Sequence, residues 1–280
     1  MTPYTYSKTD DLAILKLEHD GDGIMTQQHY HDTFEVLFIT EGERYVFFNN
    51  VMEKVSKGDM ILFLPYVLHA SRPSEGKDYR RYRINFNINA LMPVLSETEA
   101  QRLLNELHTA VIHISNGGVA TMGKYLDRLM ELQTREDTLS KKLTAIGMVS
   151  LILTLCDFIK DSHHTYKRDI VCSDRFADIL NFINSNYTRH ITLDDAVEYA
   201  HMSKTHFCRL FKKETGITFL KHINNLRLAR AHYLLVHTSF SIRLIAEMAG
   251  FSSLLQFERI FKNANGKSPQ ALRRSLAASN

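Results

Sequence analysis

Three histidines and a glutamate in the first quarter of the chain have a spacing that suits a metal ion or a polar ligand. They lie in the pattern G-x5-H-x-H-x3-E-x6-G, whose fixed members are Gly23, His29, His31, Glu35 and Gly42. A further candidate, His69, stands eleven residues after Gly58. Residues two or four apart on a β-strand point to the same face, so this spacing predicts one shared cavity for the four side chains.

Two kinds of chemistry fit these side chains. Imidazole and carboxylate groups are ligands of first-row divalent metals, and the same groups also line pockets for organic molecules. A spacing motif alone does not establish the geometry that a metal needs. We therefore expect no metal cofactor and favour a metal-free pocket, with a divalent metal held by His29, His31, Glu35 and His69 as the alternative.

A second set of reactive side chains lies in a repeated unit near the other end of the chain. Ser203–Gly216 and Ser253–Gly266 share Phe, Arg, Phe, Lys and Gly at an offset of 50 residues. Each copy follows a short stretch with apolar residues at helical spacing. The pattern predicts two helix-turn-helix units, in which the serines cap the second helices and the glycines end them.

The second helix of each unit should present a polar face to solvent. At about 100° per residue, Arg209 and Lys212 fall opposite the apolar Phe207 and Phe211. Arg can bond guanine edges in the major groove and Lys can hold phosphate. We expect DNA contacts from Lys204, Thr205, Cys208, Arg209, Lys212, Leu254, Leu255, Glu258, Arg259 and Lys262.

A long helix is expected between the two units. Residues 217–237 form one helical pattern of 21 residues, which would span about 31 Å. Successive major grooves on one face of B-DNA lie about 34 Å apart, so this helix could hold two reading heads one turn apart. Arg227 falls within its apolar arc and is expected to be a structural arginine paired with a carboxylate.

The stretch from residue 192 to residue 274 resembles the DNA-binding domain of the AraC family of bacterial transcription regulators. The matching segments are residues 207–216, 226–231, 245–251, 257–262 and 266–269, with Arg273. Leu254, Leu255 and Glu258 stand where the family usually has small or polar residues. Leucines can contact only thymine methyl groups, so we expect the second unit to read sequence weakly.

The resemblance implies a regulator rather than an enzyme. Its expected partners are double-stranded promoter DNA, RNA polymerase, a second copy of the chain and a small-molecule effector, such as a sugar. In the family a cupin-like N-terminal domain usually senses the effector. The rival interpretations are a metal-dependent cupin enzyme, or a metal-sensing regulator, that uses the three histidines and Glu35, and a helical protein-interaction module, which leaves the outward arginines unexplained.

The first part of the chain is expected to be β-rich. Segments 34–40, 44–48, 60–64, 81–87 and 111–114 are short and rich in β-branched or aromatic residues, which predicts a sandwich or barrel. The histidine motif resembles the two sequence motifs of the cupin fold, a small jelly-roll barrel. The second motif departs from the pattern, because its proline is shifted to Pro65 and Tyr66 stands where glycine is usual. Further pocket-lining candidates are Arg44, Tyr66 and Arg83.

Helical patterns follow over residues 97–108, 119–135 and 139–159, after a break expected at Asn116–Gly118. We predict an α+β multidomain chain in four parts. These are a cupin-like sensor barrel (1–115), a helical linker and dimerisation segment (116–162), an interdomain linker (163–172) and an all-α DNA-binding domain with two helix-turn-helix units (173–280).

Composition agrees with a soluble, cytoplasmic nucleic-acid binder. Residues 172–280 hold 15 Lys/Arg against 8 Asp/Glu, whereas residues 1–171 hold 19 against 23, and a basic domain behind an acidic one fits a tethered DNA binder. The three cysteines form no metal-type cluster. No signal peptide is expected, and the densest apolar run, residues 148–155, is shorter than the ~18 residues of a membrane span.

Overall fold

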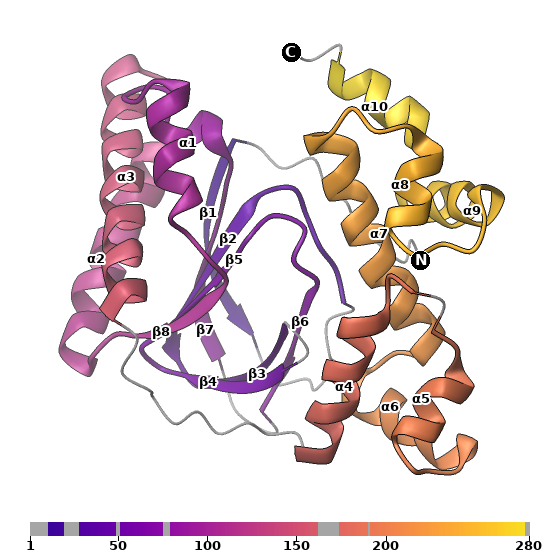
Figure 1. Cartoon of the computed structure of the whole chain (residues 1–280). Helices are drawn as coiled ribbons and strands as arrows, with labels where there is room; N and C mark the ends of the chain where they lie inside the picture. Colours follow the sequence, from indigo (N-terminus) through magenta and orange to yellow (C-terminus); the bar gives the residue numbers. More distant parts are fainter. Residues whose placement is uncertain are drawn as a thin grey trace.

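The computed structural model describes residues 11–19, 28–48, 51–74, 79–161, 174–189 and 191–277. A β-rich part with three flanking helices is followed by an all-helical part, and the two lie side by side (Figure 1). The predicted order of a β-rich domain before a helical domain is therefore correct. Gly23 and the predicted linker at 163–172 lie outside the described residues.

The described strands form two antiparallel sheets. One has the order β1-β7-β2-β5-β8 and the other β4-β3-β6. The strands are β1 (Leu12–His19), β2 (Phe34–Glu41), β3 (Glu43–Phe48), β4 (Val51–Ser56), β5 (Asp59–Phe63), β6 (His69–Pro73), β7 (Tyr79–Phe86) and β8 (Ala110–His113). The five predicted strands are confirmed to within two residues. The sequence missed β1, β4 and β6, and β6 has the sequence HASRP, with little β-forming character.

Alternation along the strands gives the five-stranded sheet two buried faces. Val36, Phe38 and Ile84 point to one face, where they join a core with the helices beside them. Leu37 and Phe63 point to the other face and pack in the barrel interior against the three-stranded sheet. Each fully buried apolar side chain contributes roughly 1.5–3 kcal/mol relative to exposure. Because side chains alternate between the two faces, a one-residue register slip would move the polar interior residues to the face that packs against the helices.

Three helices cover the outer face of the larger sheet (Figure 1). They are α1 (Glu97–Asn105), α2 (Asn116–Gln133) and α3 (Thr138–Asp161), and the short helix η1 (Ile88–Ala90) precedes them. The predicted break at Asn116–Gly118 is wrong, because these residues form the first turn of α2.

Helix α3 is more apolar than the run at residues 148–155 suggested. Its segment Thr138–Lys160 has a mean hydropathy of 1.8 and is long and apolar enough to cross a membrane by length and composition alone. Among the described residues this is one such helix, which is weak evidence for a membrane span, because a core helix of a soluble protein passes the same test. Of its most apolar window, 44% is buried inside the protein. Its outer face leaves Leu139, Ile146 and Leu153 exposed.

The helical part contains the two predicted helix-turn-helix units. Helices α5 and α6 form the first unit, α8 and α9 form the second, and α7 connects them. The bounds are α4 (Asp174–Asn186), α5 (Leu193–Tyr199), α6 (Lys204–Thr215), α7 (Phe219–His237), α8 (Ile242–Met248), α9 (Leu254–Asn265) and α10 (Pro269–Ala277). Ser203 and Ser253 accept backbone N–H groups at the starts of α6 and α9, and Gly216 and Gly266 end these helices at φ 75° and 71°. Both predicted capping pairs are confirmed.

The connecting helix α7 has 19 residues, about 28 Å, so the predicted helix was two residues too long. Arg227 on α7 donates from Nε to the carbonyl of Tyr187 at 2.8 Å and from Nη2 to the carbonyl of Arg189 at 2.9 Å. Its role is structural, as predicted, but its partners are backbone carbonyls rather than the predicted carboxylate. It fixes the turn after α4 against α7.

Candidate sensor site and nucleic-acid interface

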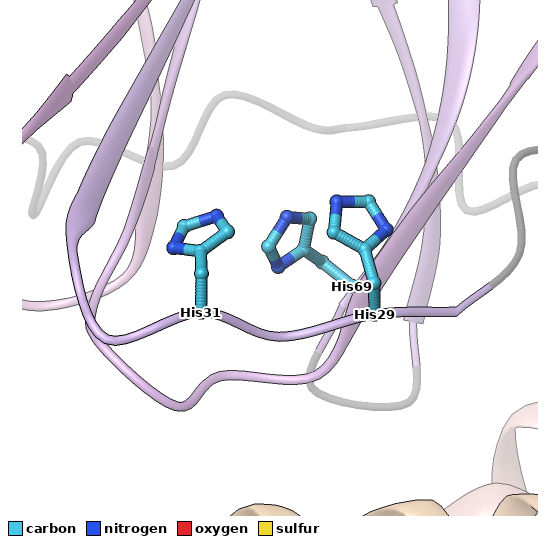
Figure 2. A group of neighbouring side chains, drawn as sticks. All are labelled: His29, His31 and His69. Carbon is cyan, nitrogen blue, oxygen red and sulfur yellow. The ribbon is translucent and has the colours of Figure 1, made fainter. Parts of the chain in front are cut away.

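The three histidines of the motif lie together at one end of the barrel interior. One potential ligand atom from each of His29, His31 and His69 lies within 4.8 Å of the others, and the three rings stand next to one another (Figure 2). The prediction that His29 and His31 lie on a regular strand is wrong, because β2 begins at Phe34. His29 instead forms an isolated antiparallel bridge with His69, with N···O distances of 2.9 and 3.0 Å.

Glu35 of β2 lies beside two of these histidines, outside the group of three whose ligand atoms lie within 4.8 Å of one another. Its Oε2 lies 3.1 Å from His31 Nε2 and its Oε1 lies 3.8 Å from His69 Nε2. The Asn85 side-chain amide donates to Oε2 at 3.0 Å. Burial opposes ionisation of the Glu35 carboxyl, but the hydrogen bond with His31 and the neighbouring imidazoles hold its pKa below the usual value. A buried carboxylate therefore faces the histidines.

Backbone carbonyls orient two of the rings. His31 Nδ1 lies 2.9 Å from the Thr33 carbonyl oxygen, and His69 Nδ1 lies 2.8 Å from the Val67 carbonyl oxygen. A carbonyl only accepts, so each Nδ1 carries a proton. Nε2 of the His69 ring then presents a lone pair, whereas Nε2 of His31 donates to Glu35 Oε2. Burial, followed by the charge of His29, lowers the pKa of His69 to about 3. Its buried Nε2 has no hydrogen-bond partner among the described residues.

A cationic group lies in the same barrel interior. Arg44 of β3 is only 2% exposed, and its guanidinium carbon lies 4.7 Å from the centre of the Tyr79 ring. Burial lowers the pKa of Arg44, and nearby Arg81 lowers it further. Nε and Nη1 of Arg44 and Nε of Arg83 are buried without a hydrogen-bond partner in the described part of the chain.

Tyr79 and Arg81 also line this interior and were not among the predicted pocket residues. Arg81 Nη1 donates to the Tyr79 hydroxyl at 2.9 Å. A signal for both was available, because residues 79, 81 and 83 alternate along β7 and share one face. Along β3, Arg44 is four residues from Phe48, which pairs with His69. Arg44 and the histidines thus lie about 13 Å apart along the barrel.

Tyr66 does not join the other pocket candidates. Its φ of 64° is left-handed, and its N–H donates to the His31 carbonyl at 2.8 Å. Its ring lies 6.0 to 6.2 Å from the rings of His232, Tyr233 and His237. Tyr66 therefore faces α7 at the junction of the two domains, which corrects its predicted place in the barrel pocket.

The histidine segment also contacts the helical domain. Gln28 Oε1 lies 2.9 Å from His222 Nδ1, and the Tyr30 hydroxyl lies 3.0 Å from His232 Nδ1. Burial lowers the pKa of His222 to about 3 and that of His232 to about 4, so both rings are neutral near pH 7. Positions 28 and 30 thus contact α7, while the alternating positions 29 and 31 belong to the histidine cluster.

The outward faces of α6 and α9 are exposed. All ten predicted DNA-contact residues of these helices are exposed to solvent. Lys204 Nζ forms an ion pair with Asp194 at 2.8 Å. In the described part of the chain, Arg209, Lys212, Arg259 and Lys262 form no ion pair. Leu255 is 78% exposed, which is unusual for a large apolar side chain without a partner.

Comparisons with known proteins agree with this architecture. A family model described as AraC-like ligand binding domain matches residues 12–140, and one described as Helix-turn-helix domain matches residues 196–275. An uncharacterised HTH-type transcriptional regulator of Staphylococcus aureus is 21% identical over 84% of this chain and 31% of its own length. The Msm operon regulatory protein of Streptococcus mutans is 31% identical over 35% of each chain.

Solved structures give weaker similarities. Apo ToxT K231A of Vibrio cholerae is 12% identical, with a TM-score of 0.40 over 96% of this chain and 98% of its own. The DNA-binding domain of AdpA in complex with a target DNA is 26% identical, with a TM-score of 0.37 over 39% of this chain and 97% of its own.

The chain spans about a third of the length of the Staphylococcus relatives that it matches. The two family models nevertheless match the two parts of this chain, the ligand-binding model on the β-rich part and the helix-turn-helix model on the helical part that follows it. The interpretation as a regulator, rather than as a metal-dependent cupin enzyme, is confirmed by this match. The chain belongs to the AraC family of helix-turn-helix transcriptional regulators, with an AraC-like ligand-binding domain ahead of its helix-turn-helix domain.

Proposed function

We propose that this chain is a cytoplasmic regulator that binds double-stranded promoter DNA through α6 and α9 and responds to a small-molecule effector. The observation that carries the proposal is the exposure on α6 and α9 of Arg209, Lys212, Arg259 and Lys262, which form no ion pair with any described residue. The connecting helix α7 has 19 residues, which fits a separation of about one DNA turn. The four-part division at residues 115, 162 and 172 belongs to the proposal.

Selection of DNA from a random library by the full chain tests the DNA-binding part. Recovered sites should share two blocks about one helical turn apart, with the stronger block assigned to α6. Leu254, Leu255 and Glu258 themselves offer little hydrogen bonding toward bases other than cytosine, which leaves Arg259 as the guanine-reading candidate of α9. A variant that combines Arg209→Ala with Arg259→Ala should recover no consensus. Recovery of the same consensus would exclude these helices as the readers.

The proposed effector is a small polar metabolite, such as a sugar, held in the barrel between the histidine cluster and Arg44 and Arg83. A ligand regulates only if it binds one state of the protein better than another. Residues 28–31 provide a direct connection, because His29 and His31 face the barrel while Gln28 and Tyr30 are bonded to α7. A ligand that moves this segment would change the contact with the helix that holds both recognition helices.

A divalent metal as effector is the second candidate, and the orientation of the histidine rings favours it. Nε2 of His69 presents a lone pair beside the Glu35 carboxylate, and Nε2 of His31 donates to the same carboxylate. A cation would take the place of the proton between His31 and Glu35, and backbone acceptors on the distal ring nitrogens are common around metal-binding histidines. The three imidazoles suit zinc or another first-row metal, and the Glu35 carboxylate lies beside two of them.

Elemental analysis of purified full-length protein separates the two candidates. A metal effector predicts about one equivalent of zinc or another first-row metal after dialysis, lost in His69→Ala and retained in His113→Ala. His113 lies on β8 and pairs with Asp59, so it is a matched control away from the cluster. Metal-free wild-type protein that also takes up no zinc or nickel during titration would exclude the metal candidate.

We further propose a homodimer that pairs through α3 and recruits RNA polymerase at the promoter. The exposed Leu139, Ile146 and Leu153 recur at intervals of seven residues, a spacing that suits self-association of two helices. Sedimentation of Ile146→Glu should give a monomer where the wild type gives a dimer. An unchanged sedimentation coefficient would exclude α3 as the interface.

A further inference from the structure

We propose that the effector of the barrel is a phosphorylated sugar, whose phosphate group binds to three arginines inside the barrel. This is the effector site of the proposed function, and the phosphate assignment rests on that function. The arginines are Arg44 of β3 and Arg81 and Arg83 of β7. Arg44 stands four residues, about 13 Å, along β3 from Phe48, whose partner is His69.

Strand register places the three arginines on the inner side of the barrel. Arg83 pairs with Leu37 of β2. Leu37 belongs to the apolar core between the two sheets, and paired residues of an antiparallel sheet point to the same face. Arg81 lies two residues from Arg83 on β7 and therefore shares this face. Arg44 reaches the same place from the other sheet, where it contacts the Tyr79 ring.

Two guanidinium groups meet at one aromatic ring. The guanidinium carbons of Arg44 and Arg81 lie 4.7 and 5.3 Å from the centre of the Tyr79 ring. Contact with a ring engages the face of a guanidinium and leaves its N–H groups for acceptors. Nε of all three arginines and Nη1 of Arg44 are buried without a hydrogen-bond partner among the described residues. Buried polar atoms are bonded in most native proteins, so these donors point to an absent acceptor.

The carboxylates of the barrel interior do not neutralise these arginines. Glu35 is bonded to His31 and Asn85. Glu53 of β4 alternates with the interior Val55, and it forms no ion pair with Arg44. Within the described chain none of the three arginines has an ion-pair partner. Because a buried charge is costly unless it is paired, the cluster requires an anion from outside the described residues.

The charge of the cluster identifies the chemical class. A phosphate monoester has a charge of about −1.5 to −2 at pH 7 and three strong acceptor oxygens, which suits several guanidinium groups better than the single charge of a carboxylate. Arginine binds phosphate through parallel N–H···O bonds. The Tyr79 hydroxyl accepts from Arg81 Nη1 at 2.9 Å, and its own proton can be donated to a phosphate oxygen.

The sugar would extend along β7 toward the histidine cluster. Asn85 lies four residues, about 13 Å, beyond Arg81 on this strand, and its side chain donates to Glu35. Sugar hydroxyls both donate and accept, so they can bond to these two polar groups. The interior is reached from the side of β1, because Leu15, the partner of Arg83 on that strand, is 40% exposed.

Isothermal titration calorimetry of the full chain without DNA tests the phosphate assignment. The probes are a panel of hexose and pentose phosphates, with their unphosphorylated sugars, glucuronate as a carboxylate analogue, and inorganic phosphate. We expect at least one sugar phosphate to bind roughly tenfold or more tightly than its parent sugar, glucuronate and free phosphate, because charged hydrogen bonds to arginine are lost or the sugar contacts are missing in the others.

Three results would overturn the assignment. A parent sugar or glucuronate that binds as tightly as every sugar phosphate would show that the phosphate group is not recognised. Free phosphate that binds as tightly as every ester would show that the site takes the inorganic ion. No saturable binding of any phosphate up to ~10 mM would remove the site.

Matched variants locate the phosphate group. Arg44→Gln should weaken binding of the sugar phosphate roughly tenfold or more and change binding of the parent sugar less. Arg80→Gln is the control, because Arg80 lies on β7 between the site residues, points to the other face and pairs with Glu18 and Glu41. Arg83→Gln, at a half-buried position, tests the site even if Arg44→Gln does not fold. Unchanged affinity in Arg83→Gln, or in a folded Arg44→Gln, would overturn the location.

Selection of DNA from a random library separates this assignment from the proposed function. A chain that recovers a DNA consensus and binds no sugar phosphate remains a regulator, and the phosphate assignment fails. A chain that binds the sugar phosphate and recovers no consensus retains the site, and the proposed DNA-binding function fails.

Discussion

At the level of single residues, sequence spacing predicted contacts between side chains of one local segment. It did not predict contacts between residues that are far apart in the sequence and meet only in the folded protein. The interval between His29, His31 and Glu35 predicted their convergence, and the structure places them together. Gln28 was missed, because its partner His222 is 194 residues away and lies in the other domain. No local pattern could reveal such a pair, since only the packing of the two domains brings its members together.

The two basic residues of α6 should behave differently toward DNA. Arg209→Ala should cost roughly 1–3 kcal/mol of binding free energy on a cognate site and relax preference at one base pair. Lys212→Ala should weaken binding to all DNA sequences alike. It should also reduce the slope of log K against log salt concentration by about 1, the value of one phosphate contact. Fluorescence anisotropy on cognate and scrambled duplexes at several salt concentrations measures both effects. Arg128→Ala, an exposed arginine of α2, is the control.

Equal losses on cognate and scrambled DNA for Arg209→Ala would remove its base-reading role. The distinction is physical, because a phosphate contact is present on every sequence, whereas a guanine contact exists only at the right base.

At the level of secondary structure, capping and periodicity predicted the helical domain more accurately than the barrel. Ser203, Gly216, Ser253 and Gly266 all stand at the predicted helix ends. Strands β1, β4 and β6 were missed, because strand propensity depends on the neighbours that a strand acquires. The first turn of α2 at Asn116 was also missed, since two glycines after it predict a break when local propensity is considered alone.

Gly58 lies at the turn between β4 and β5, where its φ is 95°. A Cβ at this position would lie 2.6 Å from the Ile114 carbonyl oxygen. Gly58→Ala should therefore lower the free energy of unfolding by about 2–3 kcal/mol, from left-handed strain and the backbone clash. Denaturant unfolding measures the change.

Gly117→Ala is the matched control for that substitution. Nothing lies within 4 Å of a Cβ built on Gly117, which lies in the first turn of α2. The change should be neutral or stabilising by up to ~1 kcal/mol. Equal effects of the two substitutions would show that the turn at Gly58 adapts to a side chain.

At the level of the whole molecule, the two domains share buried histidines. His222 contacts Phe47 of the sensor domain and Phe211 of α6, and burial alone lowers its pKa to about 3. His232 contacts Tyr30, Tyr66 and Phe261, and burial alone lowers its pKa to about 4. No charged group contributes to either shift, so the neutral rings depend on the closed junction.

This arrangement predicts that acid weakens the folded state. Both pKa values lie below the ordinary 6.5, so the unfolded chain takes up protons that the folded chain excludes. Stability from the neutral rings is present above pH 6.5 and is lost as the pH falls toward 4, by about 2 kcal/mol per histidine at pH 5. Urea unfolding across this range measures the slope.

The double variant His222→Gln, His232→Gln should show a flatter pH profile, whereas His108→Gln on the surface should retain the wild-type slope. Part of the slope should persist in the double variant, because the lowered pKa of His69 acts in the same direction. A double variant with the full wild-type slope would show that the junction histidines do not control acid stability.

The most direct test of the proposed function is hydroxyl-radical footprinting of the full chain on a DNA site recovered by selection. Two recognition helices joined by α7 predict two protected segments on one face of the duplex, about 10 base pairs apart. Arg209→Ala should remove protection at the α6 segment first. A single protected segment that is indifferent to Arg209→Ala and to Arg259→Ala would contradict the proposal that α6 and α9 read adjacent grooves.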